Sequence, residues 1–190
     1  MLVFLDFEAS SLSERSYPVE VGWVFEDGQE EDHLIRPPPA WTDWDPSAEA
    51  IHRIGREELL ARGRDHTKVA QRMVEVLTGH DLCASAPSWD GKWLSALLRA
   101  AGLPRHTLRM RGSDAVLDEA VRPILAAVLP SSELDAAVAG LLARNKIQQP
   151  NPAHRALADA RQERERWVAV REAAKDLAVR SRVAHTPGRG

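Results

Sequence analysis

Residues 2–8 read LVFLDFE, and this short segment gives the clearest structural signal in the chain. The residues that precede Asp6 in it are apolar and suited to a strand, so they predict a buried β-strand. Alternate strand residues share one face, so Asp6 and Glu8 are expected to present two carboxylates side by side. Burying like charges together is costly unless a cation offsets them or their pKa values shift. The segment therefore favours a divalent metal site; the alternative is that Glu8 lies beyond the strand and Asp6 on a solvated edge.

Two further acidic positions lie far along the chain. Asp90 directly follows Trp89 after a predicted mid-chain strand, and Asp159 follows His154 by five residues. Helical residues advance by about 100° each, so a five-residue gap separates His154 and Asp159 by roughly 140°. They cannot share one helix face, which predicts His154 on the approach to a helix and Asp159 on its inward face. Taken singly, Asp90 could be a helix cap, Asp159 an exposed carboxylate and His154 a loop histidine.

In this order and spacing, the three motifs resemble those of the DEDDh branch of the ribonuclease-H-like 3′–5′ exonucleases. That family includes polymerase proofreading subunits, ribonuclease T and oligoribonuclease. The resemblance extends from the first residue to about residue 170, and its strength lies in the combination, since each motif alone is common. The matched residues are, motif by motif, Asp6 and Glu8, Trp89 and Asp90, and His154 and Asp159.

The resemblance implies two-metal-ion hydrolysis of a phosphodiester bond, with two Mg²⁺ or Mn²⁺ ions held by four carboxylates. In the family pattern Asp6 bridges both ions. Glu8 and Asp159 hold the ion that carries the attacking water, and Asp90 acts mainly through the second ion or its waters. His154 is the implied general base, a role that suits imidazole because it exchanges a proton near neutral pH.

The same resemblance implies three contacts with the end of a nucleic-acid strand. Leu12 matches an apolar residue that the family wedges against the terminal base, and Trp89 offers a face on which a base can stack. His52 lies in AIHRIG, which resembles the family's His-Gly-Ile approach to the nucleotide. The residues alone leave other interpretations open: Leu12 and Trp89 could equally be core, and His52 a surface-helix histidine.

The chain departs from the family pattern at two places. Ser85 and Ala86 stand where the family usually carries His-Asn. After the first motif the family often has two threonines, where this chain has Ala9, Ser10 and Ser11. Neither change removes an expected metal ligand, so both bear on substrate contacts and rate more than on the type of reaction.

Hydrophobic periodicity and turn signals outline the remaining elements. Three strands form a predicted antiparallel meander, and strands then alternate with helices. This pattern describes an α/β fold with a mixed five-stranded sheet and helices on both faces, of the ribonuclease-H-like class. The strands are expected at residues 2–8, 19–25, 31–35, 82–86 and 107–110. The helices are expected at residues 47–61, 67–77, 91–101, 115–128, 133–146 and about 155–183.

Composition favours a globular protein outside membranes. Of the 190 residues 44% are hydrophobic, but no apolar stretch approaches the roughly 20 residues that cross a bilayer. The start of the chain lacks a signal-peptide pattern, which predicts a cytoplasmic protein. The single cysteine, Cys83, excludes an internal disulfide and is expected to be a buried thiol. One exonuclease domain is expected over residues 1–184, with a disordered tail at 185–190.

The net charge of −3 is unevenly distributed along the chain. Residues 151–190 hold nine Lys/Arg and five Asp/Glu, a balance of +4, which leaves −7 for the first 150 residues. A metal-dependent nuclease needs an acidic site, so this acidity does not exclude a nucleic-acid partner. The basic C-terminal segment is either a phosphate contact or a solvated helix face.

The sequence as a whole predicts a metal-dependent 3′–5′ exonuclease whose partner is the 3′ end of single-stranded DNA or RNA. Two alternatives stay open. One is an enzyme restricted to very short oligoribonucleotides, which would suit the net negative charge of the first 150 residues. The other is a weakly active or inactive nucleic-acid-binding module of the same fold, against which the complete motif set argues. The oligomeric state is left open, a homodimer included.

Overall fold

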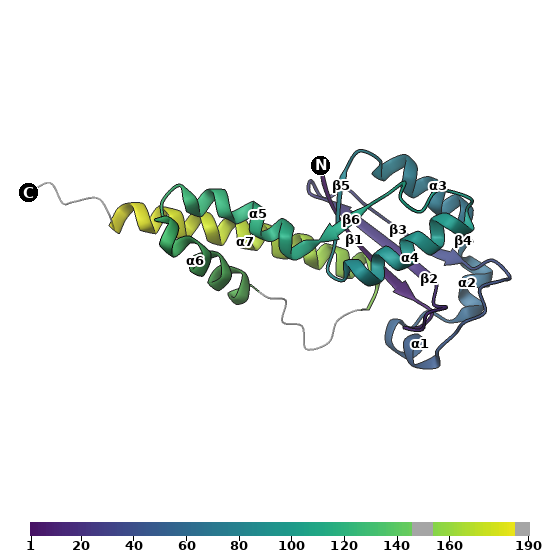
Figure 1. Cartoon of the computed structure of the whole chain (residues 1–190). Helices are drawn as coiled ribbons and strands as arrows, with labels where there is room; N and C mark the ends of the chain where they lie inside the picture. The colour runs from purple at the N-terminus through teal and green to yellow at the C-terminus, as the bar shows by residue number, and fades with distance from the viewer. Residues whose placement is uncertain (146–153, 185–190) are drawn as a thin grey trace, which may run out of the picture.

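A computed structural model describes residues 1–145 and 154–184 (Figure 1). A sheet with its covering helices forms one end of the molecule, and three helices extend from it as a long arm. The tail predicted at residues 185–190 lies outside the described residues.

Six strands form the sheet in the part of the chain that the structure describes. They are β1 (Leu2–Ala9), β2 (Pro18–Phe25), β3 (Glu30–Arg36), β4 (Arg64–Asp65), β5 (Asp81–Ala84) and β6 (Met110–Gly112). Their order across the sheet is β4-β3-β2-β1-β5-β6. The first three strands pair antiparallel, which confirms the meander, while β5 runs parallel to β1 and β6 parallel to β5. The predicted mixed sheet is therefore confirmed.

The predicted number of strands was wrong by one. The additional strand, β4, has two residues and pairs parallel with the end of β3. A segment this short carries no alternation of apolar and polar residues, so sequence periodicity could not reveal it.

Seven helices accompany the sheet in the described residues. They are α1 (Pro46–His52), α2 (Arg56–Arg62), α3 (His66–Leu77), α4 (Pro87–Ala100), α5 (Ser113–Ala126), α6 (Ser131–Arg144) and α7 (Ala156–Ala184). None of the helices in the described ranges is long and apolar enough to cross a membrane.

The central strand β1 separates two layers of core. Its odd-numbered residues Val3, Leu5 and Phe7 pack against buried side chains of α3 and α4. Its even-numbered residues Leu2 and Phe4 pack against α5 and α7. Alternate strand residues point to opposite faces, so helices cover both faces of the sheet, as predicted (Figure 1). Asp6 and Glu8 continue the even-numbered series and therefore share the α7 face.

Cys83 of β5 belongs to the layer beneath α5 and α7. It is fully buried, and burial raises the pKa of its thiol to about 12. The expectation of a buried thiol is confirmed.

The arm consists of α6 together with the parts of α5 and α7 that extend beyond the sheet (Figure 1). Its helices share a separate apolar cluster. The buried members of the cluster are Leu117, Val121, Leu125, Val138, Leu141, Val170 and Ala174.

Two predicted helices differ clearly from the structure, whereas the other predicted helices agree with it within two residues at each end. The helix expected over residues 47–61 is divided into α1 and α2, because Arg53 adopts a left-handed backbone with φ 59°. The helix expected from Gly91 begins earlier, with Pro87 in its first turn. Proline suits the first turn because its missing N–H would have no partner there.

Gly22 of β2 lies directly beneath the first turn of α7. A Cβ atom at this position would lie 2.3 Å from the backbone nitrogen of Leu157. Gly22→Ala is therefore expected to lower the free energy of unfolding by about 3 kcal/mol, since a helix backbone cannot yield as a side chain can. Gly91→Ala is the control, because nothing lies within 4 Å of its Cβ position. That helical change is expected to stabilise by about 0.5–1 kcal/mol.

Urea unfolding of the two glycine variants measures both effects. A Gly22→Ala midpoint equal to that of the wild type would contradict the close packing of α7 on β2.

Candidate active site

The two acidic residues of the first motif both lie inside β1. The strand continues to Ala9, so the alternative that Glu8 lies beyond it is wrong. On the neighbouring strand, Asp6 pairs with Gly22 and Glu8 with Glu20. The absence of a side chain at Gly22 leaves room for the start of α7 beside the two carboxylates.

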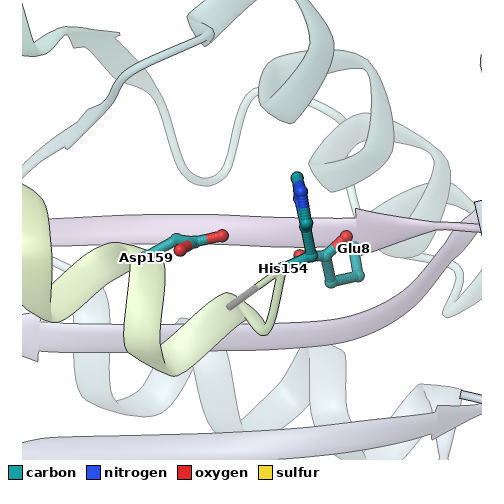
Figure 2. Close-up of side chains that lie close together, drawn as sticks. All are labelled: Glu8, His154 and Asp159. Atoms are coloured by element: carbon teal, nitrogen blue, oxygen red, sulfur yellow. The ribbon is translucent and has the colours of Figure 1, made fainter. Parts of the chain in front are cut away.

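Helix α7 brings the third motif to the same place. His154 lies just before the helix with a left-handed backbone, φ 45°, and Asp159 lies in its first turn. Figure 2 shows these two side chains together with Glu8 of β1. One potential ligand atom from each of the three residues lies within 4.8 Å of the others. The histidine does precede the helix, and the carboxylate does face inward.

Asp90 approaches β1 from the opposite layer of the fold, and it is not one of the three residues whose ligand atoms lie within 4.8 Å of one another. It lies within the first turn of α4, past the N-cap residue Ala86, so the interpretation of Asp90 as the helix cap is wrong. Its side chain is 1% exposed, and its Oδ1 atom accepts a hydrogen bond of 3.3 Å from the backbone N–H of Phe7. Its Oδ2 atom is buried and has no hydrogen-bond partner among the described residues. A buried oxygen without a donor is a natural position for a cation ligand.

The pKa values of these carboxyl groups reflect their mutual repulsion. Burial raises the pKa of Asp6 well above its usual range, and the charges of Asp90, Glu8 and Asp159 raise it further. Burial and Asp159 raise the pKa of Glu8 to about 8, and burial raises that of Asp90 to about 7. The pKa of Asp159 is also raised by burial, although nearby His154 lowers it. The acidic set is thus poorly stabilised without a cation, and its oxygen donors fit Mg²⁺ or Mn²⁺.

A further carboxylate on α7 lies outside the three sequence motifs. Glu163 follows Asp159 by four residues on α7, and its charge contributes to the raised pKa of Asp6. Burial also raises the pKa of Glu163 itself. The signal was present, because residues four apart share a helix face, but the family motif ends at Asp159.

A hollow next to the carboxylates receives two of the predicted substrate contacts. Its volume is about 290 Å³, and Glu8, Leu12, His52 and His154 are among its lining residues. Leu12 is 70% exposed, so the alternative that it belongs to the core is wrong. His52 is 2% exposed, and its Nδ1 atom accepts a hydrogen bond from the backbone N–H of Ile54. It is therefore not a surface-helix histidine.

Trp89 lies apart from that hollow. It is 37% exposed and stacks on Trp93 with ring centroids 5.7 Å apart. It lines a second hollow, of about 510 Å³, together with Glu14, Ser88 and Lys92. The structure therefore gives Trp89 an accessible surface but does not bring it into the hollow that contains Leu12 and His52.

Stability should depend on pH and divalent cations because of the raised carboxyl pKa values. The carboxyl groups of the cluster hold more protons in the folded protein than in the unfolded chain, where they titrate normally, up to about pH 8. Above about pH 7, where the carboxyls and histidines whose pKa is lowered have already lost their protons in both states, Tm without divalent cations is therefore expected to fall as pH rises. At pH 8, saturating Mn²⁺ should raise Tm by about 5–10 °C. Differential scanning calorimetry, with EDTA at matched ionic strength as the control, tests this; a Tm at pH 8 unaffected by Mn²⁺ would refute it.

Comparison with known proteins places the fold. No family model and no curated protein matches the sequence. The zinc-bound E. coli exonuclease I complex with single-stranded DNA matches with a TM-score of 0.64 and 17% sequence identity, covering 97% of this chain and 43% of that one. The protein has the exonuclease I fold. The resemblance to 3′–5′ exonucleases drawn from the sequence is thereby confirmed at the level of the fold.

Two other exonuclease I structures give the same result. E. coli exonuclease I in complex with a dA16 oligonucleotide matches with a TM-score of 0.62 and 19% identity, over 93% of this chain and 42% of that one. A moderately thermophilic exonuclease I from Methylocaldum szegediense matches with a TM-score of 0.63 and 18% identity, over 96% and 44%. This chain spans less than half the length of the exonuclease I chains it matches.

Proposed function

We propose that this chain is a metal-dependent 3′–5′ exonuclease that removes nucleotides from single-stranded DNA or RNA. The observation that carries the proposal is the convergence of β1, α4 and α7, which bring acidic side chains and one histidine to the end of the central strand. Exonuclease I structures solved with single-stranded DNA have the same fold, which favours DNA as the first substrate to test.

Four carboxylates would hold the two divalent ions, Mg²⁺ or Mn²⁺. These ligands are Asp6, Glu8, Asp90 and Asp159. When bound, such ions stabilise charge on the phosphoryl group and lower the pKa of a coordinated water. His154, within 4.8 Å of Glu8 and Asp159 through its ring nitrogen, would remove the proton from the attacking water.

The hollow beside Glu8 and His154 would take the end of the strand. Its volume of about 290 Å³ is near the lower limit for small-ligand sites, so it suits one nucleotide rather than a paired duplex end. The exposed side chain of Leu12 would pack against the terminal base. A contact of this kind ignores base identity, so the proposal includes only mild sequence preference.

Substrate topology tests the proposal. A linear single strand should be degraded, a closed circular single strand should remain intact, and a blunt duplex should be degraded much more slowly because unpairing costs a few kcal/mol. Cleavage of the circle would refute an exonuclease. A length series of RNA and DNA oligomers separates general activity from the alternative of an enzyme restricted to very short RNAs.

Leu12→Ala is expected to weaken binding of the strand end without stopping the reaction. Burial of a leucine side chain is worth about 1.5–3 kcal/mol, so KM should rise about tenfold or more while kcat stays within about twofold. Leu60→Ala is the matched control, since Leu60 is also exposed, at 52%, but belongs to α2 and does not line the hollow. Steady-state kinetics on one oligonucleotide measures both variants. Equal KM values for both would contradict the role given to Leu12.

A further inference from the structure

A buried glutamate of the second strand anchors the beginning of α7. Glu20 is 1% exposed and pairs with Glu8 on the adjacent strand β1. Its Oε1 and Oε2 atoms accept hydrogen bonds of 3.1 and 3.0 Å from Nε of Arg155, and Oε1 also accepts one of 2.5 Å from Nη2. Oε2 further accepts a bond of 2.9 Å from the backbone N–H of Ala156. One carboxylate thus binds a side chain and the first free N–H group of the helix.

The backbone of β2 fixes the same helix turn from below. Two residues beyond Glu20, Gly22 lets Leu157 approach so closely that a Cβ atom would lie 2.3 Å from its backbone nitrogen. The start of α7 is therefore held by a steric contact at Gly22 and by a charged hydrogen-bond network at Glu20. The negative charge of Glu20 at the helix N-terminus stabilises the first turn of α7 further.

The anchored turn contains both site residues supplied by α7. His154 directly precedes Arg155, and its left-handed backbone, φ 45°, is one that non-glycine residues adopt only when their surroundings impose it. On the other side, the backbone N–H of Asp159 donates a hydrogen bond of 3.0 Å to the carbonyl oxygen of Arg155. A shift of Arg155 would therefore move the imidazole and the carboxylate together.

We propose that Glu20 and Arg155 form a positioning pair that holds His154 and Asp159 in the geometry needed for catalysis. The pair acts through the helix start, and the inference rests on the proposed exonuclease function. A displacement of about 1 Å at reacting groups can lower a rate about 100-fold, so a small relaxation of this turn is enough for a large effect.

The structure contains a matched pair for comparison. Glu30 of β3 accepts hydrogen bonds from Nε and Nη2 of Arg161, so it too links the sheet to α7 through a bidentate ion pair. The two arginines are equally exposed, at 49%, but Glu30 is 33% exposed where Glu20 is 1%, and Arg161 lies further along the helix. If any link between sheet and α7 served equally well, loss of either pair would have the same effect.

The test compares Glu20→Gln with Glu30→Gln in the full chain. Glutamine keeps the shape of Glu20, but it has no charge and one of its two acceptor oxygens is replaced by an NH₂ donor. Arg155 therefore loses its ion pair and at least one hydrogen bond to this side chain is lost. Arg155→Ala provides a second variant that leaves the Ala156 bond in place and changes a half-exposed side chain. Steady-state kinetics on a single-stranded oligonucleotide with Mn²⁺ gives kcat and KM. Amide hydrogen exchange over residues 156–160 reports the order of the helix start without requiring activity.

For Glu20→Gln we expect kcat to fall about 10–100-fold with KM within about twofold, and exchange over residues 156–160 to accelerate. Arg155→Ala should change both quantities in the same direction, and Glu30→Gln neither. The proposal is overturned if Glu20→Gln has the wild-type kcat, if only its KM changes, or if Glu30→Gln lowers kcat as much as Glu20→Gln does. If the wild type is active and Glu20→Gln keeps the wild-type kcat, the positioning role is refuted and the proposed exonuclease function is not. An inactive wild type refutes the proposed function, and the positioning role with it.

Discussion

Replacing Asp6 with asparagine is expected to lower the rate of nucleotide release about 10³-fold or more. Asp6 is central in the acidic cluster, since its pKa is raised by burial and then by Asp90, Glu8 and Asp159. A neutral amide is a poor ligand between two cations, and the loss of several kcal/mol of charge stabilisation gives a factor of this size at 1.36 kcal/mol per tenfold. Single-turnover hydrolysis of an oligonucleotide with Mn²⁺ measures the effect.

Asp27→Asn is the control for this substitution. Asp27 is an exposed carboxylate in the turn after β2, where it accepts a hydrogen bond from the backbone N–H of Gln29, a bond that asparagine can also accept. Its activity should equal that of the wild type. Undiminished hydrolysis by Asp6→Asn would remove the basis for a metal site built on β1.

His154→Ala should lower kcat about 10²–10⁴-fold, the usual contribution of a general base. The same variant also decides between two chemical roles, because a ring nitrogen of His154 lies close enough to Glu8 and Asp159 to share a cation with them. As a base it would leave Mn²⁺ affinity unchanged, whereas as a ligand its loss would weaken binding. We expect unchanged affinity by isothermal titration calorimetry.

His106→Ala controls for the loss of an imidazole, since His106 is exposed and belongs to the loop before β6. It should retain full activity and full Mn²⁺ affinity. If His154→Ala kept the wild-type kcat, the base would have to be another group.

The regular parts of the fold were predictable from the sequence because they bury apolar residues that recur at strand or helix spacing. Strand β1 has an apolar run ending in two carboxylates, and α3 has a buried stripe at helical spacing. The errors lie where the backbone departs from periodicity. Arg53 ends α1 in a left-handed conformation that residue type alone does not indicate, and β4 is a two-residue strand that exists only through its pairing with β3.

In the candidate site, too, features set by the local sequence were predictable and contacts between distant segments were not. Glu8, His154 and Asp159, taken from two of the motifs, do come together, because strand alternation and helix entry fix where their side chains point. Contacts between distant segments were not predictable: nothing in the local sequence indicates that Asp90 binds the N–H of Phe7 or that Glu20 binds Arg155. Burial of His52 likewise depends on how α1 packs, which its own sequence does not specify.

The polarity of degradation is the most direct test of the proposed exonuclease activity. A single strand labelled at its 5′ end is incubated with the protein and Mn²⁺, and samples are taken over time. We expect a ladder of labelled products that shorten by one nucleotide at a time from the 3′ end, and no products when EDTA replaces Mn²⁺. Immediate release of a labelled mononucleotide, or the same ladder in EDTA, would contradict it.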